Sequence, residues 1–362
     1  MWIAYTRKMG LGRMSSGNQV SYRQFLHRLR FLAKKALEKY GVEEASLGFK
    51  SYSGNGLYQI TVLPESNETT SLPPGRYALR LHQPGYMKPE YISSELVWLS
   101  ALCEAGIEVP KPFRNADGNW LTTVEGEFDV PRHSNCTLLS WVEGRFLEKG
   151  LRPKHFESLG EVMGMMHEQS MNWKKPQGFK RPHWDWEGLF GDGFDYGFVA
   201  QEARDGIPKK HQQLFKKTLD LVEEASQQFG KGKQSYGLIH TDLGNTLFRA
   251  GKAYPFDFDD CGFGHWIFDL GVVLAHYMID SEGTSPKMRS ALVEGYQNTS
   301  PLPESNLEYL DLFIAARLAQ LMFFYQGMAL NFPQHREESM REIDHSAKYL
   351  KQILKKPLIG RV

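Results

Sequence analysis

The chain has 362 residues, of which 41% are hydrophobic and 13% are aromatic, so two domains or lobes with a sizeable buried core are expected. Its 43 Lys and Arg residues nearly balance its 42 Asp and Glu residues, for a formal charge of +1. This balance gives no reason to expect a nucleic acid or an anionic membrane as a partner.

The three cysteines, Cys103, Cys136 and Cys261, form no CxxC pair. This argues against a disulfide framework or a zinc site and favours a reducing compartment, the cytoplasm. The chain lacks a run of about 18 apolar residues, so no membrane span is expected. Residues 1–19 lack the apolar stretch of a secretory signal, and we interpret them as a flexible tail.

The first predicted elements are a helix and a pair of strands. Apolar residues recur at helical spacing from Val20 to Tyr40, and Gly41 ends the pattern. Residues 45–62 are typical of two strands around a turn of small residues at 51–56. This turn either lets backbone amides approach phosphate groups or is a plain hairpin turn.

A strand over Arg76–His82 and a helix over Ser93–Ala105 follow, and each carries one charged residue of interest. Arg80 lies between two leucines of the strand, where a positive charge needs an anionic partner unless the strand is an edge strand facing water. Glu95 lies in the first turn of the predicted helix, where it either complements the helix dipole or pairs with Arg80.

The sequence then changes from strand-rich to helix-rich. Asp117-Gly118-Asn119 is predicted as a hairpin turn between two strands, and Thr137–Val142 as the last strand. The composition therefore predicts an N-lobe over residues 20–138, with an antiparallel sheet plus helices, and a helical C-lobe over residues 139–362.

The C-lobe is predicted to contain helices at residues 156–169, 209–229, 270–279, 288–297, 306–327 and 336–354. His167 lies on the apolar face of the first, where a hydrogen-bonded core histidine is more common than a ligand. Residues 174–197 form a long aromatic loop that either lines a substrate pocket or packs on the helices. Trp184, Asp185 and Trp186 of this loop suit a cationic or amino-bearing acceptor.

The stretch from Gly237 to Gly271 concentrates residue types that carry chemistry. Two apolar runs, separated by a turn at residues 249–252, each precede a set of polar residues. If the runs pair as a hairpin, both sets meet at one end. Their oxygen atoms suit a hard cation such as Mg²⁺, which favours bound phosphate. The sets are His240, Asp242 and Asn245, and Asp257, Asp259 and Asp260.

Phosphoryl transfer depends mainly on positioning and charge neutralisation, which suggests a role for each of these residues. Asp242 is the candidate base that takes the proton of the acceptor hydroxyl. Asn245 and Asp257 are the candidate metal ligands. His240 and Asp259 are candidates for supporting contacts around the metal. In the N-lobe, Arg80 is the candidate cation for the nucleotide phosphates, and Glu95 would orient it.

These residues and motifs occur in an order that identifies a family. After Arg80 and Glu95 come the segments LLSWVEG, GEVMGMMH, IHTDLGNTLF and PFDFDDCGFGHWIFDL. Together they resemble the aminoglycoside phosphotransferase/choline kinase superfamily of small-molecule kinases, and they are similar to its stress-response kinase branch. The resemblance implies an α+β, two-lobed protein-kinase-like fold.

The resemblance also implies the reaction and its cofactors. ATP would be held at a hinge formed by Leu139, Ser140, Trp141 and Val142. With Mg²⁺, its γ-phosphoryl group would be transferred to a small-molecule hydroxyl. Some stress-response kinases phosphorylate protein Ser or Thr instead. The expected partners are ATP and a small acceptor, with no nucleic acid and no membrane, and the expected assembly is a monomer or homodimer.

The sequence departs from the family pattern at three points. The usual spacing from base to metal-binding asparagine is five residues, whereas Asp242 and Asn245 are three apart. The loop is thus shorter by about 7 Å of extended chain. Arg80 stands where a lysine is usual, and the glycine-rich loop is barely recognisable. The alternative function is therefore a catalytically weak or inactive nucleotide-binding or interaction protein on a kinase scaffold.

Overall fold

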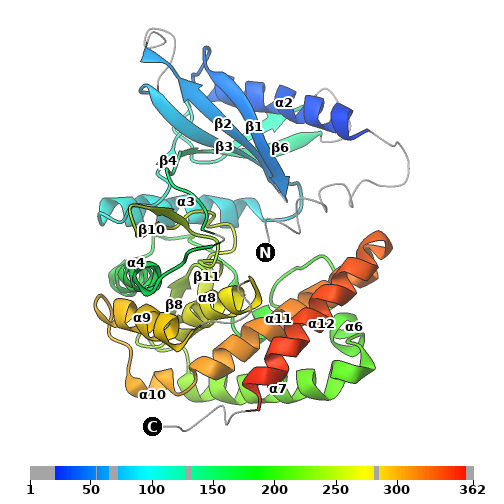
Figure 1. Ribbon diagram of the computed structural model, residues 1–362. Coiled ribbons are helices and arrows are strands. Elements are labelled where there is room, and N and C mark those ends of the chain that lie inside the picture. Colours follow the sequence, from blue (N-terminus) through cyan, green and yellow to red (C-terminus); the bar gives the residue numbers. More distant parts are fainter. Residues whose placement is uncertain are drawn as a thin grey trace. The chain divides into compact units, whose positions relative to one another are not determined.

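The computed structural model describes residues 21–53, 55–64, 72–126, 132–147, 149–280 and 285–355. The predicted tail at residues 1–19 lies outside these ranges. The chain divides into two compact units, one ending at Glu143 and the other beginning at Gly144 (Figure 1). The sequence-based division after residue 138 falls within a strand, β6 (His133–Ser140), which belongs wholly to the first unit.

Within the residues that the structure describes, the first unit contains one antiparallel sheet and two helices. The strand order is β1-β2-β3-β6-β4, and β5 also pairs with β6. The helices are α2 (Tyr22–Lys39) and α3 (Pro89–Glu104). The remaining strands are β1 (Ser46–Ser53), β2 (Asn55–Val62), β3 (Gly75–His82), β4 (Pro112–Phe113) and β5 (Thr122–Glu125).

Helix α2 forms where the apolar spacing predicts it and supplies the core of the first unit. Ser21 and Gln24 close its N-terminus with a capping box, in which each side chain accepts a hydrogen bond from the other's backbone N–H. Its apolar stripe, which includes Leu29 and Leu32, joins one buried cluster with alternate residues of β2 such as Tyr58 and Ile60.

Three local predictions for the first unit were wrong. Strands β1 and β2 continue through most of the proposed turn at residues 51–56, because Ser53 still pairs with Asn55. Helix α3 begins at Pro89, a favoured first-turn residue, rather than at Ser93, so Glu95 lies beyond the first turn. The strands that flank the turn at residues 117–119 both pair with β6 instead of with each other.

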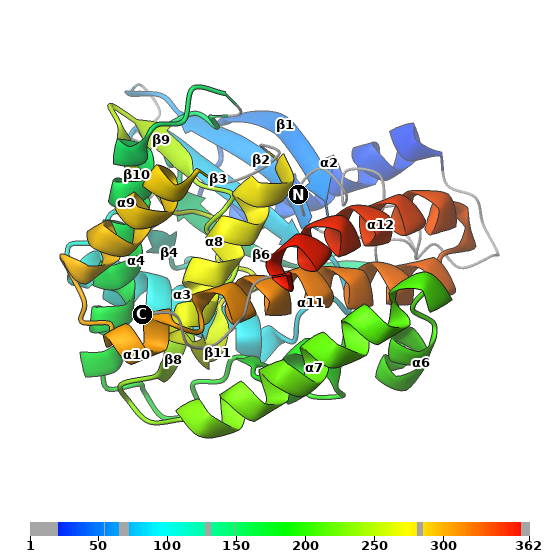
Figure 2. The same ribbon diagram turned by 60° about the horizontal axis from the view of Figure 1, so that its bottom comes forward.

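The second unit is mainly helical. Helix α11 runs alongside α7 and α12, as both views show (Figure 2). The helices are α4 (Pro153–Asn172), α5 (Trp186–Phe190), α6 (Ala200–Asp205), α7 (Lys209–Phe229), α8 (Trp266–Asp280), α9 (Pro286–Gln297), α10 (Glu304–Leu307), α11 (Leu310–Asn331) and α12 (Arg336–Ile353). A short 3₁₀ turn, Pro333–His335, lies between the last two helices.

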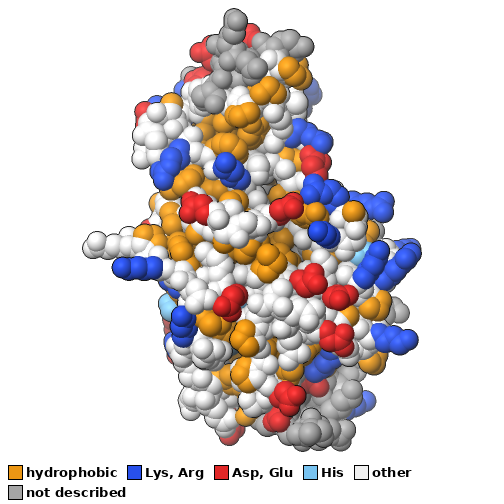
Figure 3. Space-filling model, turned by 90° about the vertical axis from the view of Figure 1, so that its left-hand side faces the viewer, with side chains coloured by type: hydrophobic (Ala, Val, Ile, Leu, Met, Phe, Trp, Pro, Cys, Tyr) orange, Lys and Arg blue, Asp and Glu red, His pale blue; other side chains and the backbone are white. Residues whose placement is uncertain are grey.

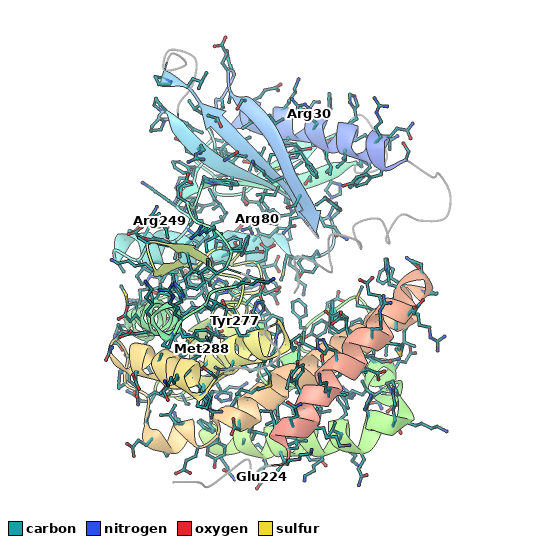
Figure 4. The ribbon with its side chains drawn as sticks, viewed as in Figure 1. Arg30, Arg80, Glu224, Arg249, Tyr277 and Met288 are labelled. Carbon is teal, nitrogen blue, oxygen red and sulfur yellow. The ribbon has the colours of Figure 1, made fainter. Side chains whose placement is uncertain are left out.

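The strands of the second unit pair differently from the predicted hairpin. β8 (Tyr236–Ile239) pairs with β11 (Gly262–His265), which also pairs with β7 (His183–Trp184). The true hairpin joins β9 (Leu247–Arg249) to β10 (Lys252–Tyr254). The apolar run before Asp257 is therefore not the partner of β8. Figure 4 labels Arg249, whose guanidinium lies 4.2 Å from the ring centre of Tyr254 in this hairpin.

Helix α11 is the core of the second unit, as its apolar sequence predicts. Among the described helices it is the one long and apolar enough to cross a membrane, yet its apolar window is 100% buried inside the unit. Such burial is typical of a core helix. The exposed side chains have the mixed charge expected from the composition: on the face shown in Figure 3, acidic and basic residues are interspersed.

Candidate active site

Arg80 and Glu95 form a buried ion pair in the first unit. The Arg80 guanidinium donates a hydrogen bond of 2.9 Å to Glu95 Oε1, and the two side chains are 8% and 1% exposed. Arg80 projects from β3, next to helix α3 (Figure 4). The alternative of an edge-strand arginine facing water was wrong, because β3 lies between β2 and β6.

Residues 139–142 continue from the end of β6. Leu139 pairs with Ala78 of β3, and Ser140 exchanges two hydrogen bonds of 2.8 Å with the backbone of Lys111. The Trp141 N–H donates to the carbonyl of Arg76. These contacts fix the course of the backbone where the first unit ends, which is the segment expected to hold the nucleotide base.

In the second unit, the shortened loop places the candidate base beside the candidate metal ligand. The Asn245 side-chain amide donates to Asp242 Oδ2 at 2.7 Å, and the Asn245 backbone N–H donates to the Asp242 carbonyl at 3.1 Å. Because a carboxylate only accepts hydrogen bonds, the amide nitrogen of Asn245 is fixed on Asp242. Its carbonyl oxygen is therefore the atom left for a cation.

A glycine permits this short loop. A Cβ on Gly244 would lie 2.3 Å from Cγ of His276, a side chain of α8. The pKa of His276 falls to about 3, chiefly through burial, so the imidazole packed against the loop is neutral at neutral pH.

Asp269, at the start of α8, holds the backbone of this loop. Its carboxylate accepts hydrogen bonds from the N–H groups of His240 at 2.8 Å and Thr241 at 2.6 Å. His167 Nε2 donates to the same carboxylate at 3.0 Å, and His167 Nδ1 lies 3.0 Å from the Tyr296 hydroxyl. Burial acts to raise the pKa of Asp269, but these hydrogen bonds hold it below its usual value. The prediction that His167 is a hydrogen-bonded core residue is confirmed.

His240 connects the loop of Asp242 to the segment before Asp257. Its Nε2 donates to the carbonyl of Phe256 at 3.1 Å, while its Nδ1 accepts from the Asp242 N–H at 3.3 Å. Burial lowers the pKa of His240, so the neutral tautomer with the proton on Nε2 fits both contacts. One imidazole thus fixes the loop of Asp242 and the segment before Asp257 relative to each other.

Asp257 has a backbone conformation that is uncommon for a residue other than glycine. Its φ is 62°, in the left-handed region, and Thr241 has φ 69°. Such residues cost about 1–3 kcal/mol each and cluster at functional sites. Thr241 is held by Asp269 and by a 3.0 Å hydrogen bond from its hydroxyl to the Asp260 carbonyl.

Two side chains from the aromatic segment hold the loop that follows Asp257. The guanidinium of Arg181, which is 3% exposed, donates to the carbonyls of Cys261 and Asp259 at 2.5 Å and of Phe258 at 3.4 Å. The Trp184 indole N–H donates to the Asp260 carbonyl at 2.7 Å. We define residues 257–261 as the metal loop. These contacts make its shape depend on Arg181 and Trp184.

The structure places Trp184, Asp185 and Trp186, the residues predicted to face a cationic acceptor, in contacts within the second unit. Trp184 is buried under the metal loop. Asp185 caps α5 through the Gly188 N–H and pairs with Lys231 at 2.6 Å, which holds its pKa low against the opposing effect of burial. Trp186 lies near the Arg204 guanidinium. All three side chains therefore have contacts within the second unit, and their role toward an acceptor stays a prediction.

The donor set fits a metal ion held jointly with nucleotide phosphates. Within the described residues, no cluster of three or more His, Cys, Asp or Glu side chains could hold a metal by itself. Mg²⁺ bound with a nucleotide needs only one or two protein carboxylates, because phosphates and water supply the other oxygens. The carbonyl oxygen of Asn245 and the carboxylate of Asp257 are of the required type.

Sequence reasoning missed three residues of this region: Asp269, Arg181 and Arg317. Arg317, on α11, has its guanidinium 3.9 Å from Asp242 Oδ1. Asp269 and Arg317 each interrupt an apolar helix with a charge, and this signal was available in the sequence. Arg181 precedes a proline in a loop and carries no comparable pattern.

The amino-acid sequence is similar to those of known phosphotransferases. Residues 67–307 match the phosphotransferase enzyme family. An amicoumacin kinase from Bacillus subtilis (strain 168) is 24% identical over 340 residues, which are 88% of this chain and 91% of that protein.

Two solved structures share the fold over nearly their whole length. A microcompartment-associated aminopropanol kinase has 26% sequence identity and a TM-score of 0.74, covering 91% of this chain and 99% of that chain. An amicoumacin kinase in complex with AMP-PNP, Ca²⁺ and Ami has 20% identity and a TM-score of 0.71, covering 94% and 98%.

Proposed function

Because the chain belongs to the phosphotransferase enzyme family, we propose that it transfers the γ-phosphoryl group of ATP to a hydroxyl of an amino-bearing small molecule, with Asp242 as the base. The resemblance to the aminoglycoside phosphotransferase/choline kinase superfamily is confirmed, and so is the α+β, two-lobed protein-kinase-like fold. The chain is thus a kinase with an alcohol group as acceptor.

The observation that carries the proposed mechanism is the hydrogen bond of 2.7 Å between Asn245 and Asp242. A loop shortened by two residues could have separated these side chains. A misplacement of a catalytic group by only ~1 Å can lower the rate about 10²-fold. Their contact instead supports an active kinase over an inactive scaffold. Asp242 accepts the hydroxyl proton as the acceptor oxygen attacks phosphorus.

The other residues position the nucleotide. Asn245 and Asp257 would hold the divalent ion, for which we propose Mg²⁺, and the ion would neutralise charge on the phosphates. Arg80 would bind phosphate oxygens, with Glu95 orienting its guanidinium. Residues 139–142 would hold the nucleotide base. His240 would fix the position of the catalytic base, Asp242, relative to the metal loop.

An amino-bearing acceptor is supported by the names of the similar proteins. One of them is an aminopropanol kinase, whose substrate name combines an amine and a hydroxyl group. Transfer to a protein Ser or Thr remains the alternative suggested by the stress-response kinases. A screen of amino alcohols, hydroxy amino acids and amino sugars against a Ser/Thr peptide library separates the two.

The mechanism is tested with the substitutions Asp242→Asn and Asp257→Ala. We expect Asp242→Asn to lower kcat by about 10³-fold, because the base is lost, while ATP still protects the protein in a thermal shift. Asp257→Ala should abolish both transfer and the Mg²⁺-dependent part of ATP protection. Asp344→Asn, which removes a half-exposed carboxylate paired with Lys210, is the matched control.

Two results would contradict the proposal. Full turnover by Asp242→Asn would remove that residue from the role of base. Mg²⁺-dependent ATP binding by the wild-type protein, with no transfer to any member of the acceptor library, would favour the nucleotide-binding scaffold instead.

A further inference from the structure

Arg317 is the one charged side chain of the apolar middle of helix α11. From Leu312 to Gly327, all of which the structure describes, it is also the one residue that is only partly buried, whereas the others are buried. Its side chain is 11% exposed. A charge at this position costs desolvation energy, which an anionic partner must offset.

The partners of Arg317 do not use its full hydrogen-bonding capacity. One terminal nitrogen donates to Gln320 Oε1 at 2.9 Å. The other lies 3.9 Å from Asp242 Oδ1, which is too long for a hydrogen bond. A guanidinium carries five N–H donors in a flat fork. Arg317 therefore presents donors next to the candidate base without bonding to it.

The Gln320 side chain connects Arg317 to a group of aromatic residues in the second unit. Gln320 is buried, and its amide nitrogen lies 3.5 Å from the Tyr196 hydroxyl. The Tyr196 ring in turn packs at 5.5 Å from Phe323 and 6.5 Å from Trp184, between ring centres. In such surroundings a charge-assisted hydrogen bond is stronger than in water. The positive charge of Arg317 therefore favours a hydrogen-bonded anion beside its guanidinium.

We propose that Arg317 binds a carboxylate of the acceptor, so that the preferred substrate is a small hydroxy acid, such as a hydroxy amino acid. The proposal rests on the proposed function, in which Asp242 receives the proton of the acceptor hydroxyl. The hydroxyl would lie at Asp242 and the carboxylate at the guanidinium, whose fork matches the two carboxylate oxygens. A short acceptor would span the two groups.

The test compares acceptors that differ only in the carboxylate: serine with ethanolamine, threonine with isopropanolamine, and homoserine with propanolamine. For the wild-type enzyme we expect kcat/KM to be roughly 10- to 100-fold higher for the carboxylated member of a pair, the range given by hydrogen bonds to charged groups. Arg317→Gln should bring this ratio close to one, mainly through KM, and Arg317→Lys should keep part of it.

Arg289→Gln is the matched control, because Arg289 pairs with Asp311 at the start of the same helix. It should keep the wild-type ratio. A second readout needs no transfer: the carboxylated acceptor alone should raise the melting temperature of the wild-type protein and of Arg289→Gln, but not that of Arg317→Gln.

Three outcomes would overturn the assignment. The first is a wild-type enzyme that uses both members of each pair equally well. The second is a fall by the same factor for both members in Arg317→Gln, which would place the guanidinium on the transferred phosphoryl group. The third is equal thermal protection of the wild-type protein and Arg317→Gln. A failure of the proposed function looks different, since no acceptor would then be phosphorylated while the binding readout still reports on Arg317.

Discussion

Replacing Arg181 tests whether its hydrogen bonds to the metal loop stabilise and position that loop. Arg181→Met keeps a long side chain in a buried position but removes every donor of the guanidinium. The carbonyls of Cys261 and Asp259 lose hydrogen bonds of 2.5 Å, and the carbonyl of Phe258 loses one of 3.4 Å. The loop that begins at Asp257 should then be both less stable and less well positioned.

The expected size follows from these three contacts. A hydrogen bond that involves a charged group contributes about 1.5–3 kcal/mol, and the bond of 3.4 Å to Phe258 counts least. The two short bonds set the scale, and water reaching the freed carbonyls offsets part of the loss. We therefore expect Arg181→Met to lower the free energy of unfolding by about 3 kcal/mol.

Urea unfolding measures the stability, with Arg341→Met as the control. Arg341 is 67% exposed and has a 3.5 Å contact with Glu337, so its replacement should cost less than ~1 kcal/mol. The functional readout uses a second variant, Arg181→Lys, and is the Mg²⁺ concentration that gives half-maximal ATP turnover. We expect a rise of about 10-fold for Arg181→Lys, because residues that orient metal ligands typically change metal affinity by 10- to 100-fold.

One pair of results would refute this reasoning. If Arg181→Met unfolds at the same urea concentration as Arg341→Met, the three hydrogen bonds do not stabilise the unit. If Arg181→Lys also leaves the Mg²⁺ requirement unchanged, the metal loop keeps its shape without the guanidinium.

The remaining predictions concern three buried groups. Glu95→Gln should destabilise the first unit by about 3 kcal/mol in urea unfolding and raise KM for ATP, because it leaves a buried guanidinium without its counter-charge, and unchanged values of both would contradict the pairing. Gly244→Ala should cost about 1–3 kcal/mol, since a Cβ would lie 2.3 Å from His276, whereas Gly232→Ala, with open space around its Cβ position, should not. Burial lowers the pKa of His265 to about 4, so its contribution to stability is complete above pH 6.5 and is lost as the pH falls toward 4. His265→Phe should therefore make the acid-induced loss of unfolding free energy smaller by about 3 kcal/mol over that window. An unchanged pH profile would show that the pKa of the imidazole is the same in the folded and unfolded states.

Sequence patterns predicted the parts of the molecule that depend on local periodicity and charge. Helix α2 follows from the spacing of its apolar residues, and α11 from an apolar sequence that requires burial. The Arg80–Glu95 pair follows from a positive charge inside a strand, which needs a partner. The boundary of α3 was missed because two serines within the helix resemble an N-cap, while Pro89 was not recognised as its first residue.

Long-range pairing could not be predicted in the same way. The strand before His240 pairs with β11, and nothing local in either strand distinguishes this partner from β10. The contacts of Arg181 depend on bringing together residues about 80 positions apart. Asp269 and Arg317 were visible as charges in apolar helices, but their roles depend on where the loop of Asp242 passes.

The close packing of Gly244 against His276 has a consequence for making chimeras. Catalytic loops are natural units to exchange between related kinases, and relatives with the usual five-residue spacing would donate a longer loop. In this chain the space beside the loop is filled by an imidazole of α8, at 2.3 Å from where a Cβ would lie. A transplanted loop would collide with it. A successful exchange would therefore have to replace residue 276 together with the loop.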